Sequence, residues 1–81
     1  QDEIALASHE KSVAAWESGF FSDLVIPFGG LSRDGMPRPD TTLEKLGALH
    51  TVFDASAAGS ITAGNASPLT DGAAGVWIAN E

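Results

Sequence analysis

The sequence predicts an α/β chain whose elements follow in the order helix, short strand, irregular loop, short helix and buried strand. Apolar residues recur at helical spacing over residues 2–18, and a continuous apolar run over 73–79 has the length of a buried strand. Between them, residues 62–74 combine a Gly-Asn turn, a Ser-Pro corner and an Asp-Gly turn. The backbone must therefore make several tight turns immediately before it enters the last strand.

The first predicted element is an amphipathic helix over residues 2–18. Asp2 can cap its start, Glu3 suits its first turn, and Gly19 offers a natural stop. Residues at spacings of three and four form one stripe along it: Leu6, His9, Val13, Trp16 and Phe20. This stripe predicts a helix that packs one face against the rest of the chain.

The middle of the chain predicts a short strand, a loop and a second helix. Residues 24–26 (Leu-Val-Ile) form a β-type run closed by Pro27, and residues 28–40 are rich in glycine and proline, as surface connections are. Thr41 or Thr42 can cap a helix of about two turns. Its apolar side would be formed by Leu43, Leu46 and Leu49.

The end of the chain predicts extended structure. Ile61 and Thr62 begin an extended piece, and residues 73–79 are interpreted as a buried strand. A central parallel strand needs neighbours on both edges, and we expect none to be available within this sequence.

Composition restricts the classes of function. The 81 residues carry a net charge of −7 with only four basic residues, which argues against nucleic-acid binding and against a polybasic membrane anchor. No apolar run approaches the roughly 20 residues that span a bilayer, and no targeting segment is recognisable. The absence of cysteine excludes disulfides and thiolate metal sites within these residues. We expect a cytoplasmic protein without a transmembrane segment.

The histidines and aspartates give weak chemical signals. His9 lies in the apolar stripe, where an amphipathic side chain at the edge of a packed face is the favoured interpretation over a catalytic or ligand histidine. His50 is placed to interact with carbonyls at a helix end. The aspartates stand singly beside turn-forming residues, so no metal site is predicted.

Three residues are better candidates for binding. Arg38 lies in a stiff loop between prolines, so its guanidinium could meet a phosphate or a purine, or could be an ordinary solvated arginine. Asn65 and Ser67 stand in a turn of small residues that a ligand could approach closely. Their side chains could equally satisfy only the turn's own amides.

The segment TAGNASPLTDGAA at 62–74 resembles the thiolase family. The resemblance continues through QDE at 1–3, ASH at 7–9, RPDTTLEKL at 38–46 and VFD at 52–54, so it covers essentially the whole chain. The form SPLTDG at 67–72 is closer to degradative 3-ketoacyl-CoA thiolases of fatty-acid β-oxidation than to biosynthetic acetoacetyl-CoA thiolases.

The resemblance implies an internal piece of the thiolase fold. Residues 1–41 would be part of the inserted loop domain that binds coenzyme A, and 42–81 the return segment and a core strand of the N-terminal half. By position, Arg38 would contact the nucleotide of coenzyme A, Ser67 would lie near its pantetheine arm, and Asn65 would shape the turn beside the active site. Coenzyme A would be a substrate, and no separate cofactor is implied.

The family's catalytic groups are missing from these residues. Thiolases use a nucleophilic cysteine, a second cysteine and a histidine in a Gly-His-Pro motif, and none of these occurs here. We therefore expect no catalytic residue in the chain, no activity from it alone, and partners that include the remaining thiolase polypeptide or a companion chain. Homo-oligomers, or complexes with a hydratase/dehydrogenase subunit, are implied by the family. The alternative is a small acidic protein-interaction module without catalysis.

Overall fold

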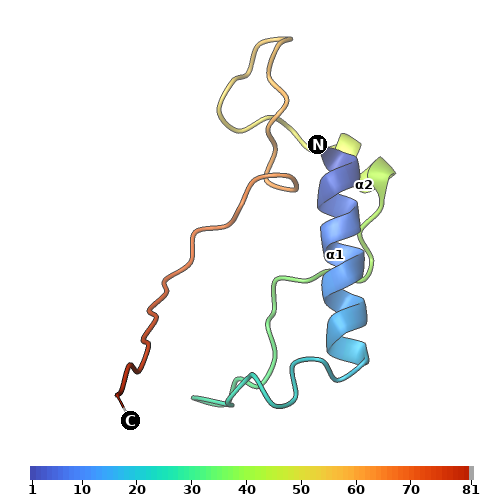
Figure 1. Cartoon of the computed structure of the whole chain (residues 1–81). Coiled ribbons are helices and arrows are strands. Elements are labelled where there is room, and N and C mark those ends of the chain that lie inside the picture. Colours follow the sequence, from blue (N-terminus) through green and yellow to red (C-terminus); the bar gives the residue numbers. More distant parts are fainter. Residues whose placement is uncertain (81) are drawn as a thin grey trace.

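A computed structural model of the chain describes residues 1–80 and contains two helices, α1 (Asp2–Glu17) and α2 (Leu43–Gly47). α1 is the long element of the molecule, and α2 packs beside its N-terminal part (Figure 1). The loop after α2 projects beyond that end of α1, while the C-terminal segment runs away from both helices (Figure 1). Within the described part of the chain, neither helix is long and apolar enough to cross a membrane.

The first helix confirms the sequence prediction to within one residue. α1 starts with Asp2 and Glu3 in its first turn and ends at Glu17, followed by Gly19 with a φ of 77°. The prediction of Asp2 as the cap was wrong, because Asp2 is already helical and Gln1 occupies the N-cap position without a side-chain hydrogen bond. The predicted stripe is half-buried from Leu6 to Trp16.

The second helix begins where it was predicted but is shorter. Thr42 is its N-cap, and its hydroxyl accepts a hydrogen bond from the backbone N–H of Lys45 at 3.2 Å, as expected for a capping threonine. The helix has five residues, so Leu49 falls beyond its end. Leu46 is the buried residue of α2, and its side chain lies against Gly64.

The two predicted strands, at 24–26 and 73–79, are absent, and that part of the prediction was wrong. Residues 24–26 follow a turn and pair with no other segment. Residues 73–79 are extended but exposed, and the Trp77 side chain is 101% accessible. A strand is stable only when neighbouring backbone satisfies its N–H and C=O groups. No segment of residues 1–80 lies alongside 73–79 to do so.

Pairing is limited to two isolated bridges in the described residues. Thr51 pairs with Thr62, where the Val52 N–H donates to the Ile61 carbonyl at 2.9 Å, so the predicted extended piece does contact another segment. The second bridge closes a two-residue turn in which Gly29 and Gly30 have φ values of 59° and 83°. Positive φ at both positions is typical of tight hairpin turns, and it explains why two glycines stand there.

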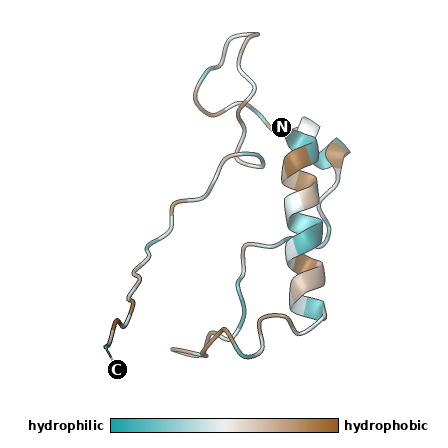
Figure 2. Cartoon of the chain, in the orientation of Figure 1, coloured by the Kyte–Doolittle hydropathy of each residue, from teal (hydrophilic) through white to brown (hydrophobic). Residues whose placement is uncertain are grey.

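The chain is open and has almost no core. Its radius of gyration is 17.0 Å, whereas about 12 Å is expected for a compact chain of this length. It exposes 7205 Å², against about 4,600 Å² for a compact protein of its mass. Exposed apolar residues lie along the 20–31 segment, which follows α1 in the chain, and near the C-terminal end (Figure 2). The buried residues among 1–80, Leu46 and Thr62, lie where α1, α2 and the 62–68 segment meet.

Candidate ligand-binding site

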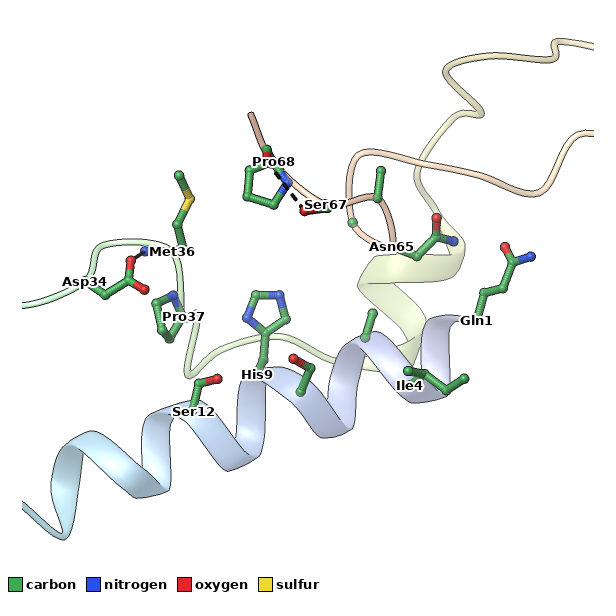
Figure 3. Close-up of a pocket in the computed structure, with 14 residues that line it drawn as sticks. Gln1, Ile4, His9, Ser12, Asp34, Met36, Pro37, Asn65, Ser67 and Pro68 are labelled. Carbon is green, nitrogen blue, oxygen red and sulfur yellow. Dashed lines mark hydrogen bonds between the residues drawn. The ribbon is translucent and has the colours of Figure 1, made fainter. Parts of the chain in front are cut away.

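Two adjoining hollows lie where α1, α2 and the 62–68 segment meet. The first, of about 500 Å³, lies between the N-terminal half of α1, the 34–37 loop and residues 64–68 (Figure 3). The second, of about 450 Å³, lies between the 36–41 segment, α2 and residues 63–68. The two share a wall made of His9, Met36, Gly64, Ala66 and Pro68. We call them the serine hollow and the arginine hollow, after Ser67 and Arg38.

The turn at residues 62–66 is held by its own side chains. The backbone N–H of Thr62 donates to Asn65 Oδ1 at 2.8 Å, and the Gly64 N–H donates to Thr62 Oγ1 at 3.1 Å. The Ala66 N–H donates to the Thr62 carbonyl at 3.0 Å. Thr62 is buried, so its polar atoms are satisfied within the turn.

Gly64 brings this turn against α2. A Cβ added there would lie 2.6 Å from Leu46 Cδ2 and 2.7 Å from Leu49 Cδ1, closer than carbon atoms pack. A glycine thus allows the backbone of the turn to approach the buried leucine directly.

Asn65 joins the turn to the start of α1. Its Nδ2 donates to Asp2 Oδ1 at 2.9 Å and to the Ser60 carbonyl at 3.1 Å, while its Oδ1 accepts from Thr62. The polar atoms of the side chain are therefore engaged with protein groups. Of the two roles left open by the sequence, this geometry favours shaping of the turn.

Ser67 lines the serine hollow and is exposed. Its hydroxyl makes only a long contact of 3.5 Å with the carbonyl of Pro68, which is at the limit of a hydrogen bond. The hydroxyl can therefore turn towards a ligand at low cost. In Figure 3, Ser67 and Pro68 lie across the hollow from His9.

Arg38 belongs to the arginine hollow. Its backbone N–H donates to His9 Nδ1 at 3.1 Å, which ties the loop to the middle of α1, and its side chain is exposed. The structure thus brings Arg38 and Ser67 to neighbouring hollows with His9 in both. The sequence predicts His9 at the edge of a packed helix face, and its partial burial agrees with that. The sequence did not predict the hydrogen bond to Arg38, because the two residues are 29 positions apart.

The arginine hollow carries an excess of positive charge. Lys45 Nζ donates to the Asp40 carbonyl at 2.7 Å and to Asp40 Oδ2 at 3.0 Å. The hydrogen bond from Lys45 lowers the pKa of Asp40 from its ordinary 3.8, the charge of Lys45 lowers it further, and the charge of Arg38 adds a smaller effect. Two cations and one ionised carboxylate line this hollow. It suits an anionic group such as a phosphate.

The remaining acidic residues serve local turns. Asp34 Oδ1 accepts from the Met36 N–H, and Asp54 Oδ1 accepts from the Ser56 N–H, both at 2.8 Å. Within residues 1–80, no group of three or more histidine, aspartate or glutamate side chains is arranged to hold a metal ion. His50 is exposed and lies outside both hollows.

Comparison with known proteins assigns the family. The family model described as thiolase, N-terminal domain, matches residues 1–81, which is the whole sequence. The chain belongs to the thiolase N-terminal domain family. The resemblance to the thiolase family is confirmed. Within the 62–74 segment, residues 63–68 line the two hollows.

Curated thiolase relatives match over the full chain. The chain is 44% identical to the acetyl-CoA acetyltransferase of Escherichia coli (strain K12) over 89 residues, which cover 100% of the chain and 22% of that relative. It is 43% identical to the probable acetyl-CoA acetyltransferase of Mycobacterium tuberculosis, again over 100% of the chain and 22% of the relative. The 3-ketoacyl-CoA thiolase of Enterobacter sp. (strain 638) is 40% identical, with 100% and 23% covered.

The chain therefore spans between a fifth and a quarter of the length of these thiolases. No solved structure matches it.

Proposed function

We propose that this chain is a segment of an acyl-CoA C-acyltransferase that cleaves 3-ketoacyl-CoA with coenzyme A to acyl-CoA and acetyl-CoA, as in fatty-acid β-oxidation. The observation that carries the proposal is the pair of adjoining hollows formed by residues of a thiolase-family sequence. Relatives named acetyl-CoA acetyltransferase and 3-ketoacyl-CoA thiolase support the reaction class.

The two hollows match the two chemically different parts of coenzyme A. The nucleotide end is anionic, and Arg38 with Lys45 offers it positive charge in the arginine hollow. The pantetheine arm is thin and alternates amide and methylene groups, which suits the small residues and the Ser67 hydroxyl of the serine hollow. Asn65 would act by fixing the turn that carries Ser67.

The covalent step of this reaction needs a group that the chain lacks. Acyl transfer of this kind proceeds through a thiolate nucleophile, and the 81 residues contain no cysteine. In this proposal the nucleophile and the proton-transfer groups come from other thiolase polypeptide, with residues 1–41 in the coenzyme A-binding insertion and 42–81 leading into the N-terminal half.

The cellular setting is part of the same proposal. SPLTDG at 67–72 favours a degradative role, while relatives with either name match at similar identity. We propose a cytoplasmic enzyme that assembles as a homo-oligomer or with a hydratase/dehydrogenase subunit. Comparing cleavage rates for acetoacetyl-CoA and for longer 3-ketoacyl-CoA substrates tests the degradative assignment, because that assignment requires cleavage of the longer substrates.

Arg38→Ala in the acyltransferase polypeptide that carries this chain tests the site. An exposed charge-assisted contact contributes about 1 kcal/mol, so the KM for coenzyme A should rise roughly fivefold. kcat should stay constant, because Arg38 would touch only the non-reacting nucleotide end. Arg33→Ala is the matched control, since Arg33 lies over the Trp16 ring and outside both hollows. An unchanged KM in Arg38→Ala would contradict the assigned role.

A further inference from the structure

His9 is the one ionisable side chain that lines both hollows in the part of the chain described. Its ring stands off α1 between the 34–37 loop and Ser67–Pro68 (Figure 3). It is half-buried, and one of its ring nitrogens already has a protein partner. The other ring nitrogen, Nε2, is therefore the atom of His9 that is free to contact a ligand.

The hydrogen bond from Arg38 determines the tautomer of His9. Nδ1 accepts the backbone N–H of Arg38 at 3.1 Å, so Nδ1 carries no proton in this arrangement. A neutral imidazole holds its single proton on the other nitrogen. Nε2 of His9 is thus a hydrogen-bond donor, and it lies at the end of the ring farthest from the helix backbone, towards Ser67 and Pro68 in Figure 3.

Within residues 1–80, the hydrogen bond from Arg38 to Nδ1 is the one that His9 makes through its ring, so Nε2 has no protein acceptor there. The side chains of Thr62 and Asn65 in the neighbouring turn are engaged with groups other than His9, and the Ser67 hydroxyl contacts only the Pro68 carbonyl. A donor that projects into a hollow of about 500 Å³ can bind an acceptor on a ligand.

We propose that His9 has two roles at the coenzyme A site: Nδ1 positions the Arg38 loop, and Nε2–H donates to an amide carbonyl of the pantetheine arm. This inference rests on the proposed function, because it takes coenzyme A as the occupant of the hollows. The pantetheine amides supply the acceptor, and Ser67 on the opposite wall limits where the arm can lie. His9 neither forms nor breaks a bond, so it is a binding and positioning residue.

Three substitutions separate the two roles. His9→Asn keeps an acceptor near the position of Nδ1 but does not reach into the hollow. His9→Gln places an amide donor near the position of Nε2 but loses the acceptor for Arg38. His9→Leu removes both. Glu10→Gln is the matched control, because Glu10 is the exposed neighbour on α1 and lines neither hollow.

The measurements are the KM for coenzyme A and kcat in the intact acyltransferase, with the Kd for coenzyme A from calorimetry. Losing one net hydrogen bond should raise KM and Kd roughly fivefold in the Asn and Gln variants, and losing both should raise them roughly 25-fold in the Leu variant. kcat should not change, and Glu10→Gln should match the parent. A residue that only filled space would give equal losses in all three His9 variants.

The outcomes distinguish this inference from the proposed function. Normal cleavage and an unchanged KM in all three His9 variants would overturn the inference and leave the proposed function standing. Coenzyme A binding without cleavage would overturn the proposed function, and the Kd series would still decide the role of His9. A parent protein that does not bind coenzyme A would overturn both.

Discussion

The turn at residues 62–66 provides the sharpest test of how the site is held, through Asn65→Ala. The substitution removes hydrogen bonds to the Thr62 N–H at 2.8 Å, to Asp2 Oδ1 at 2.9 Å and to the Ser60 carbonyl at 3.1 Å. The first two are partly buried, and the third is exposed. At about 0.5–1.5 kcal/mol each, the two partly buried bonds contribute about 2 kcal/mol to holding the turn closed.

Amide hydrogen exchange at Ala66 measures this loss directly. Its N–H donates to the Thr62 carbonyl at 3.0 Å, so it exchanges only when the turn opens. A loss of 2 kcal/mol should speed its exchange roughly 25-fold. Ser67→Ala, the control directly after the turn, should leave the exchange rate unchanged, because the Ser67 hydroxyl makes only a 3.5 Å contact. An acceleration below about twofold in Asn65→Ala would refute the reasoning.

A double-mutant cycle isolates the bond that joins the turn to α1. Asp2→Ala alone should cost less than Asn65→Ala, since it removes one of the three bonds. The coupling energy between the two sites should be about 1 kcal/mol, as for other directly bonded pairs. Coupling near zero would mean that the turn and the helix are held together by other contacts.

Three further predictions concern other parts of the chain. Gly59→Ala should lower the free energy of unfolding in urea by about 1–3 kcal/mol, because the new Cβ would lie 1.9 Å from the Asp54 carbonyl oxygen; a change below about 0.5 kcal/mol would contradict this. Lys45→Gln should raise the pKa of Asp40 towards 3.8 in an NMR titration and leave the pKa of Asp54 unchanged. In the parent chain the lowered pKa of Asp40 stabilises the fold above pH 3.8, and this contribution is lost as the pH falls below that value. Trp77→Ala in the 81-residue chain should change the free energy of unfolding by less than about 0.5 kcal/mol, because Trp77 is exposed. A decrease of several kcal/mol would show instead that residues 73–79 are buried.

The parts of the fold that could be predicted from the sequence are those decided by neighbouring residues. α1 follows from the three-and-four spacing of its stripe, and the Thr42 cap acts on an N–H only three residues away. The unpaired, exposed state of residues 73–79 could not be predicted from those residues alone. Their apolar run suits a strand, but a strand also needs pairing partners, and residues 1–80 place none beside them.

The sequence predicts two residues that line the hollows but not the bonds that place them there, and their roles towards a ligand stay a prediction. Arg38 and Ser67 were singled out by loop stiffness and turn composition, and the structure places them on adjoining hollows. The bonds that place them there join residues 29 and 63 positions apart, a separation that no local pattern reveals. The sequence signal that could have pointed to His9 was its position within the inward stripe.

Both of those long-range bonds end on the same helix. Asp2 holds the turn that carries Ser67, and His9 holds the loop that carries Arg38. The two anchors are seven residues apart on α1, which corresponds to about 10 Å along a helix axis. Because an α-helix changes its length very little, α1 fixes the separation of the two anchors even though the chain around it has almost no core. This is how an open chain can hold two hollows at a defined spacing, and why a kink in α1 between Asp2 and His9 would change the distance between them.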